Sequence, residues 1–185
     1  MRAFALWEPR CRAHYPPGQD RDYFMLHRLR GFTLIELIIV LATIVVLAAL
    51  AIASYQTYTV RAQISEGLNF AAGAKTPILA AYAANGVAPA NRTAAGMTAD
   101  AADGSGYYVS QVHIVDGRID VTFGGPSAHQ DIVGRTISLT PYAVPDDSIV
   151  WRCGAAMAPA GAPLKGTAGH RGPTVEQRYL PGYCR

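Results

Sequence analysis

An apolar stretch over residues 32–53 constrains what this chain can fold into more than any other feature. The stretch contains a single charged side chain, Glu36. As an α-helix it would be about 33 Å long at roughly 1.5 Å per residue, enough to cross the ~30 Å hydrocarbon core of a bilayer. A carboxylate at membrane depth is energetically unfavourable unless another group pairs with it. We therefore expect Glu36 to have a positively charged partner.

A short basic segment, residues 27–30, precedes the apolar stretch and is followed by Gly31. A positive flank keeps its end of an apolar helix on the cytoplasmic side of a membrane. A secretory signal peptide has a shorter apolar region, with a small-residue cleavage site after it. Here the small residue comes first, so we expect any cleavage to precede the apolar helix and to leave that helix on the product.

Residues 31–37, GFTLIEL, resemble the prepilin cleavage and methylation motif of the type IV pilins. The resemblance implies that a prepilin peptidase cuts after Gly31, that the new amino terminus at Phe32 is methylated, and that Glu36 serves filament assembly. It also offers a partner for Glu36, the α-amino group of Phe32 on a neighbouring subunit, and their pairing in a low-dielectric core would fix the register of each incoming subunit. The alternative is a single-pass membrane anchor with Glu36 at headgroup level.

The charge distribution divides the chain at the same place. Residues 1–31 hold six Arg against three acidic residues, whereas residues 32–185 hold ten Lys or Arg and ten Asp or Glu. Global charge therefore gives no argument for nucleic-acid binding. We expect residues 1–31 to be a leader. Met25 begins a seven-residue basic leader of the kind usual in the family, so the expected translation start is Met25.

Helical spacing continues beyond the apolar stretch and predicts one helix over residues 32–84. Its second half is amphipathic, with apolar residues near every third or fourth position: Val60, Ile64, Leu68 and Phe70. Pro77 is expected to bend or locally break the helix, and Asn85-Gly86 to end it. The first half, about 32–54, must lie in a membrane or pack against copies of itself, which predicts a filament core.

The stretch after the apolar run, with Tyr55, Tyr58 and Arg61, is also similar to that of major pilins. The tyrosines fit either a membrane-interface belt or a subunit contact. One departure is Ala53, because many family members carry a helix-breaking Pro near this point. The local melting of the helix that such a Pro is thought to aid during assembly is not expected here.

The rest of the chain predicts a loop over residues 85–106 and a sheet. Asp100 and Asp103 lack the spacing of an EF-hand calcium loop, so a solvated turn is the favoured interpretation. Four antiparallel strands are expected over residues 107–115, 118–123, 135–139 or a little beyond, and 148–153. The Asp116-Gly117 pair predicts a hairpin, and Pro141 and Pro145 predict turns. The expected fold class is α+β, with the sheet packed on the second half of the helix.

The segment between Cys153 and Cys184 is rich in Gly, Pro and Ala and resembles the disulfide-bounded carboxyl-terminal region of type IV pilins. Cys11 would leave with the leader, so the two remaining cysteines form an even pair, plausible as a disulfide in an oxidising compartment. Such a bridge would stabilise the region by about 3–4 kcal/mol in the chain-entropy model. The alternative is two unpaired buried thiols.

No catalytic, metal-binding or phosphate-binding motif occurs in the sequence, so we expect neither an enzyme nor a cofactor. Basic residues do gather late in the chain, and among them Lys165, Arg171 and Arg178 are candidate contacts to DNA phosphates or another anionic surface. Scattered solvated charges are the favoured interpretation, because only Tyr179 and Tyr183 lie nearby to stack on bases.

The resemblance as a whole implies a major structural subunit that waits in the inner membrane and then polymerises into a surface pilus. Its partners would be copies of itself, the prepilin peptidase, the pilus assembly machinery with separate ATPases, and DNA or a host-surface receptor. Adhesion, twitching motility and DNA uptake are the implied activities. Three alternatives stay open: a pseudopilin of a type II secretion system, a minor DNA-binding pilin, and a plain membrane-anchored binding domain.

Overall fold

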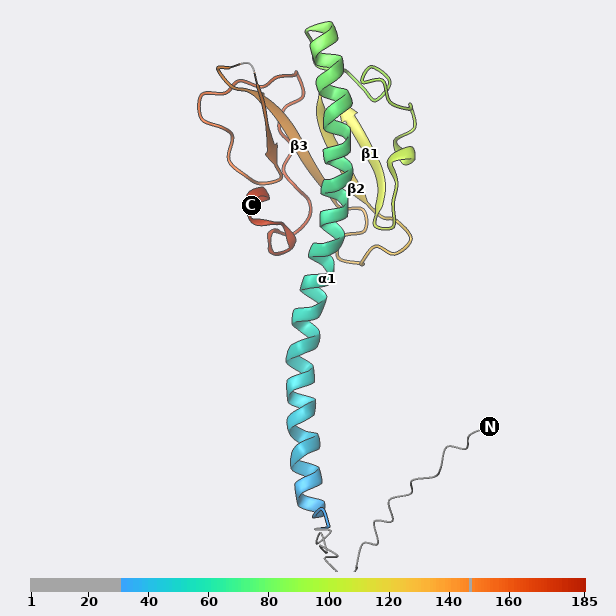
Figure 1. The fold of residues 1–185 in the computed structure, drawn as a ribbon, viewed down its shortest axis with the longest axis vertical. Coiled ribbons are helices and arrows are strands. Elements are labelled where there is room, and N and C mark those ends of the chain that lie inside the picture. Colours follow the sequence, from blue (N-terminus) through green and yellow to red (C-terminus); the bar gives the residue numbers. More distant parts are fainter. Residues whose placement is uncertain (1–30, 147) are drawn as a thin grey trace, which may run out of the picture. The chain divides into compact units, whose positions relative to one another are not determined.

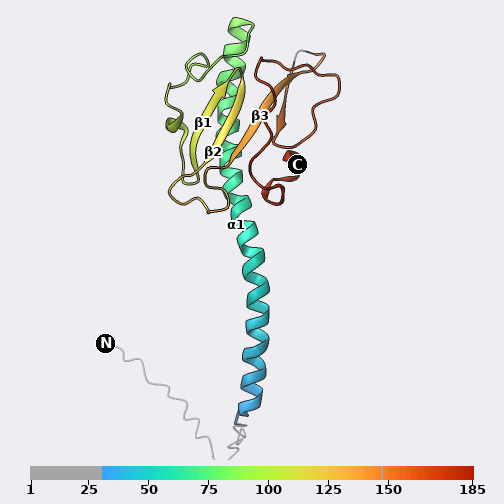
Figure 2. The same ribbon diagram turned by 180° about the vertical axis from the view of Figure 1, so that it is seen from behind.

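The structure is a computed structural model that describes residues 31–146 and 148–185. The expected leader, with its start at Met25, lies outside the described residues. One helix, α1 (Leu34–Asn85), is followed by four strands, β1 (Val109–Val115), β2 (Arg118–Phe123), β3 (Thr136–Ala143) and β4 (Ile149–Cys153). The strands form one antiparallel sheet in the order β1-β2-β3-β4 (Figures 1 and 2). The predicted α+β fold is confirmed.

Helix α1 ends where the sequence predicts but passes through Pro77. Gly86, with φ of 72°, follows the last helical residue, and its amide donates to the carbonyl of Tyr82 at 2.8 Å. The expected break at Pro77 is wrong, because the helix is continuous there. Pro77 removes the amide donor for the carbonyl of Gly73, but Gly73 is exposed, so water can hydrate that carbonyl.

The sheet follows the predicted hairpin and corrects one predicted turn. Asp116 and Gly117 have φ of 45° and 80°, as a type I′ turn requires. Pro141 was expected in a turn after the third strand, yet it lies inside β3 and pairs with Trp151 of β4. On its other side β2 does not extend as far as Pro141, because the pairing of β2 with β3 stops at Ile119 and Leu139. The carbonyl of Pro141 accepts a hydrogen bond from the amide of Lys165 at 3.0 Å. A proline is tolerated here because no strand needs an amide hydrogen from residue 141.

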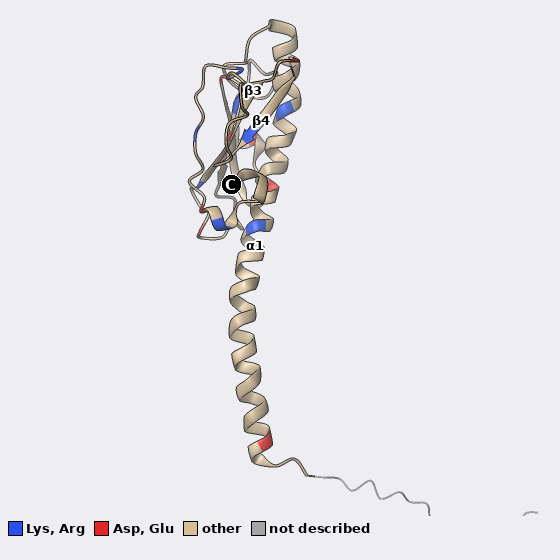
Figure 3. Ribbon diagram, turned by 90° about the vertical axis from the view of Figure 1, so that its left-hand side faces the viewer, with Lys and Arg blue, Asp and Glu red and all other residues tan. Residues whose placement is uncertain are grey.

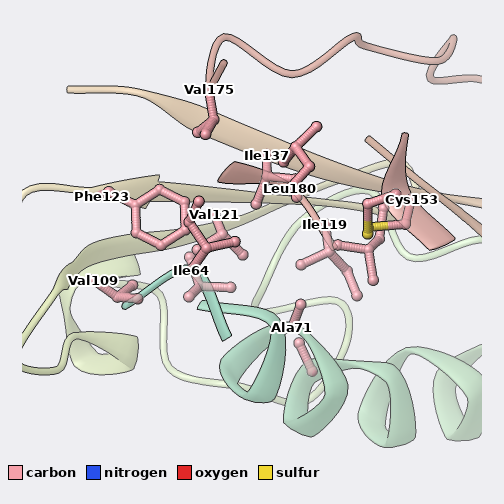
Figure 4. Close-up of a cluster of buried hydrophobic side chains, with 14 of the residues drawn as sticks. Ile64, Ala71, Val109, Ile119, Val121, Phe123, Ile137, Cys153, Val175 and Leu180 are labelled. Atoms are coloured by element: carbon pink, nitrogen blue, oxygen red, sulfur yellow. A yellow bond between two sulfur atoms is a disulfide. The ribbon is translucent and has the colours of Figure 1, made fainter. Parts of the chain in front are cut away.

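The core lies between the second half of α1 and one face of the sheet (Figure 4). The buried residues of α1 recur at helical spacing: Val60, Gln63, Ile64, Gly67, Ala71, Ala74 and Ile78. Gly67 allows close packing, since a Cβ there would lie 2.6 Å from the ring of Phe123. The buried amide oxygen of Gln63 accepts a hydrogen bond from the amide of His129 at 2.9 Å.

The carboxyl-terminal segment is attached to the sheet by a disulfide and by hydrogen bonds. Cys153, the last residue of β4, is bonded to Cys184, which confirms the predicted bridge. The amide of Ala155 donates to the carbonyl of Cys184 at 2.9 Å, and the amide of Thr174 donates to Thr136 of β3 at 2.9 Å. The segment between the cysteines thus follows the sheet although it contains little regular structure.

Candidate assembly surface

The first half of α1 is apolar and uncovered. Every side chain from residue 31 to residue 56 is exposed, and the most apolar 18-residue window of α1 has a mean hydropathy of 3.0. Residues 37–60 carry no charge, as the uninterrupted tan stretch of α1 in Figure 3 shows. Length and composition make α1 able to span a membrane. Burying one such Ile, Leu or Val side chain is worth about 1.5–3 kcal/mol, so this surface favours a cover of lipid or protein.

The residues predicted for processing and assembly lie within one turn at the start of α1. Gly31 and Phe32 precede the helix, and Glu36 is the acidic residue of its first turn. All three are exposed. A carboxylate at a helix amino terminus is also favoured by the helix dipole. The geometry brings the predicted residues together, but their processing and assembly roles stay predictions.

Thr33 belongs to the same turn and was missed in the sequence analysis. Its hydroxyl accepts a hydrogen bond from the amide of Glu36 at 3.3 Å, and its carbonyl accepts one from the amide of Leu37 at 3.2 Å. Thr33 therefore caps α1. The signal was present, because a Thr followed three residues later by Glu, just before an apolar run, is the capping-box pattern.

Arg61 follows Val60, the first buried residue of α1, and it bonds the helix to the carboxyl-terminal segment. Its guanidinium donates twice to the carbonyl of Arg178, at 2.9 and 2.7 Å, and Arg185 donates to the same carbonyl at 3.3 Å. Tyr55 and Tyr58 precede this junction and are 70% and 73% exposed. Their rings are available to a membrane interface or to another subunit.

The three candidate DNA contacts each have a neighbour within the chain. Lys165 lies over the ring of Tyr82, with its ammonium 4.4 Å from the ring centre. Arg178 pairs with Glu176 at 2.8 Å, so its charge is partly neutralised. Arg171 lies 3.8 Å from the carboxylate of Asp120. Binding of DNA by these residues stays a prediction.

A buried charge network underlies Arg171. Asp120 of β2 receives two hydrogen bonds from Arg118, at 2.9 and 2.8 Å, and Arg118 also donates to the carbonyl of Gly169 at 2.6 Å. Burial alone would raise the pKa of Asp120, but the bonds and charge of Arg118 and the charge of Arg171 outweigh burial and hold that pKa below its usual range. The network connects the sheet to the segment that follows it.

His170 lies beside this network. Its ring Nδ1 is 3.0 Å from the hydroxyl of Thr140. Burial lowers the pKa of His170, and the positive charges of Arg152 and Arg118 lower it further. Protonation of His170 would place another positive charge beside these arginines, so the neutral ring fits this site.

The sequence of this chain matches a known protein family. The family model described as pilin, the bacterial filament, matches residues 60–185. A type IV major pilin protein, PilE1, from Neisseria gonorrhoeae is 36% identical over 157 residues, which cover 84% of this chain and 87% of that protein. The chain belongs to the type IV pilin family. A fimbrial protein of Neisseria meningitidis serogroup A is 35% identical to this pilin over 161 residues, 84% of the chain and 94% of that protein.

The match extends beyond one genus. Fimbrial protein EcpC of Eikenella corrodens is 35% identical to this pilin over 160 residues, 84% of the chain and 90% of that protein. The family model begins at Val60, which is also the first buried residue of α1. Pilins are structural proteins that assemble with copies of themselves into filaments. The uncovered apolar half of α1 fits a subunit of that kind.

Proposed function

We propose that this pilin is the major structural subunit of a type IV pilus. A prepilin peptidase cuts the chain after Gly31, and the new amino terminus at Phe32 is methylated. Residues of about 32–54 hold the subunit in the inner membrane until the assembly machinery adds it to an extracellular filament. Several relatives are type IV major pilin proteins, which supports this proposal. Adhesion, twitching motility and DNA uptake are the activities proposed for the fibre.

The observation that carries the proposal is the uncovered apolar surface of α1. Its large side chains from Phe32 to Ile52 are between 41% and 76% exposed. A bilayer covers such a surface before assembly, and the helices of neighbouring subunits cover it afterwards. Both covers are apolar, so the subunit can pass from one to the other without exposing this surface to water.

Glu36 fixes the position of each subunit in this proposal. In the filament core its carboxylate pairs with the α-amino group of Phe32 on a neighbouring copy, which is positive whether or not it is methylated. Removing one partner of a buried ion pair leaves an uncompensated charge, which costs about 3–5 kcal/mol. A subunit in the wrong register leaves both charges unpaired, so the pair selects one register.

Because Glu36 also follows a cap residue, a test has to separate its charge from helix capping. Glu36→Gln removes the charge but keeps a side chain that suits the third position of a capping box. Thr33→Ala removes the cap hydroxyl and keeps the charge. We expect Glu36→Gln to abolish surface fibres, while Thr33→Ala still assembles. The measurement is the yield of sheared fibres, compared with the amount of processed subunit in the membrane.

The same pair of variants tests the membrane-anchor alternative. A plain anchor has no use for a charge pair, so fibre-sized assemblies formed by Glu36→Gln at the parental yield would contradict the proposal. Loss of fibres by both variants would mean that the start of α1, and not the charge, limits assembly. Equal amounts of processed subunit in the membrane are the control, because they show that insertion and cleavage are unaffected.

A further inference from the structure

A pocket of about 320 Å³ lies where the uncovered stretch of α1 ends and burial begins. It is lined by Arg61 and Ser65 of α1, and by residues 179–182 and Arg185 of the carboxyl-terminal segment. We call it the Arg61 pocket. Neither Asp nor Glu is among the described residues that line it, so its charged side chains are two arginines. The pocket is therefore basic.

The two arginines of the pocket are held close together by one acceptor. Arg61 donates from Nε and Nη2 to the carbonyl of Arg178, at 2.9 and 2.7 Å. Arg185 donates from Nη2 to the same carbonyl at 3.3 Å, and from Nε to the carbonyl of Leu180 at 2.9 Å. Two positive charges that share one acceptor repel each other. An anion that contacts both of them is stabilised by both charges.

The chain does not neutralise this pair of charges. Among the described residues, no side-chain carboxylate lies within 4 Å of the guanidinium of Arg61 or Arg185. Arg171 and Arg178 differ, because each lies beside a carboxylate, at 3.8 and 2.8 Å. An α-carboxylate at residue 185 would offset only one of the two charges. The Arg61 pocket thus keeps a net positive charge, which favours an anionic ligand.

The unused donors of the two guanidiniums indicate what kind of anion fits. A guanidinium carries five N–H donors in a rigid plane, an arrangement that suits the oxygens of a phosphate group. In neither Arg61 nor Arg185 does Nη1 donate a hydrogen bond within the described part of the chain. Both residues are exposed. The Nη1 side of each guanidinium is therefore accessible to phosphate oxygens, and such charge-assisted bonds are strong.

The place of the pocket along α1 favours a lipid as the source of the phosphate. Ile52 is the last large aliphatic residue of the uncovered stretch, and the exposed Tyr55 and Tyr58 follow it. Arg61 comes nine residues after Ile52, about 13 Å further along the helix. The headgroup layer of a bilayer is roughly 5–8 Å deep. Because an arginine on a helix leans toward the amino end and has a long stem, its guanidinium reaches back to that layer.

We infer that Arg61 and Arg185 bind the phosphate of an anionic phospholipid in the Arg61 pocket while the subunit is in the membrane. This inference rests on the proposed function, since it needs the membrane stage, and it names a lipid partner for that stage. The acyl chains of the lipid lie along the uncovered half of α1. A lipid with a cationic headgroup is disfavoured, because its ammonium adds a third positive charge. The bound lipid holds the subunit at the membrane surface until assembly.

Lipid retention by the processed subunit tests the inference. The chain beginning at Phe32 is placed in nanodiscs of equal parts phosphatidylglycerol and phosphatidylethanolamine, and the lipids that stay bound are identified by native mass spectrometry. We expect phosphatidylglycerol to be retained in preference. Replacing Arg61 and Arg185 together by Gln should lower that preference roughly tenfold or more. Arg185→Gln alone keeps the bonds of Arg61 to the carboxyl-terminal segment, and it should still lower the preference.

A second double variant controls for net charge. Lys165→Gln with Arg171→Gln removes the same two charges away from the pocket. Lys165 lies over the ring of Tyr82, which is 21 residues beyond Arg61 on α1, about 32 Å along the helix. We expect this control to retain phosphatidylglycerol like the parent. Equal losses in the two double variants, or parental retention after both pocket arginines are replaced, would overturn the inference.

Competition distinguishes a lipid from other sources of phosphate. Glycerol 3-phosphate and a short single-stranded oligodeoxynucleotide are added to the nanodiscs, each at the concentration of the lipid. We expect neither to displace phosphatidylglycerol. Displacement by glycerol 3-phosphate would indicate a site for free phosphate esters, and displacement by the oligonucleotide a nucleic-acid site, so either result would overturn the lipid assignment.

Solid-state NMR locates the contact directly. In phosphatidylglycerol liposomes with arginine-labelled subunit, dipolar coupling between guanidinium Cζ and lipid phosphorus should weaken with Arg61→Gln and with Arg185→Gln, but not with Arg171→Gln. Coupling that neither pocket replacement changes would overturn the inference and leave the proposed function intact. A processed chain that fails to enter bilayers at all would instead overturn the proposed function.

Discussion

At the scale of single residues, Asp120 shows how a buried charge stabilises this pilin. Its side chain is 7% exposed and that of Arg118 is 14% exposed, with the two 2.8 Å apart. We predict that Asp120→Asn lowers the free energy of unfolding by about 3 kcal/mol, because it leaves the buried guanidinium without its partner. Urea unfolding of the processed chain in detergent is the measurement. Asp146→Asn, at an exposed carboxylate, is the control and should change stability little.

Asp120 also predicts how stability responds to acid. Its folded-state pKa lies below the unfolded value of about 3.9. The stabilisation is therefore fully present above about pH 4 and is lost as the pH falls through the folded pKa. We expect the free energy of unfolding of Asp120→Asn to fall less between pH 5 and pH 3 than that of the parent. A parallel fall in both proteins would contradict this assignment.

At the scale of elements, two glycines of α1 predict opposite effects of one substitution. Gly67→Ala should destabilise the fold by about 1–3 kcal/mol, because the added methyl meets the ring of Phe123 at 2.6 Å. Gly73→Ala should stabilise it by about 0.5–1 kcal/mol, because the methyl has nothing within 4 Å and helix propensity rises. Thermal unfolding of both variants side by side is the check. The same sign of change for both would contradict the packing described for Gly67.

The carboxyl-terminal segment depends on its bridge. Replacing Cys153 and Cys184, which are 31 residues apart, by Ser should lower the free energy of unfolding by about 3–4 kcal/mol. The segment contains two short 3-10 helices and little other regular structure, so the bridge closes a mostly irregular loop. Protease sensitivity of residues 154–183 should rise in parallel. Cys11→Ser is the control, and no change is expected from it if the leader is removed.

Local patterns in the sequence predicted most of these elements. The helix end at Gly86, the hairpin at Asp116-Gly117 and the Cys153–Cys184 bridge are confirmed. The break expected at Pro77 and the turn expected at Pro141 were wrong because the effect of a proline depends on its surroundings. The carbonyl of Gly73 lies at an exposed helix turn where water can hydrate it, and β2 does not extend alongside Pro141. Neither circumstance can be read from the neighbouring residues.

The candidate site was predictable only in part, for a similar reason. Gly31, Phe32 and Glu36 are contiguous, so a short motif suffices to select them, and Thr33 was available from the capping pattern. The pocket of about 700 Å³ beside the second half of α1 was not predictable, since it brings together residues of α1, a loop and β1 that are up to 46 positions apart, from Glu66 to Val112. Only the fold places Asp103 and Gly73 at one surface.

At the scale of the whole molecule, the chain exposes one extended apolar surface, the first half of α1. In the proposed filament, copies of this half pack against one another, and Glu36 pairs with the amino terminus of Phe32 on a neighbouring copy. Contacts that join different faces of identical subunits give an open helical filament when the rotation from one subunit to the next does not close a ring.

The central claim is that removal of the leader creates the charge with which Glu36 pairs during polymerisation. The most direct measurement is to shear fibres from cells and determine the amino terminus of their main subunit by mass spectrometry. The account predicts abundant fibres whose subunit begins with N-methylated Phe32. A soluble extracellular monomer that keeps the residues ahead of Phe32 would contradict it.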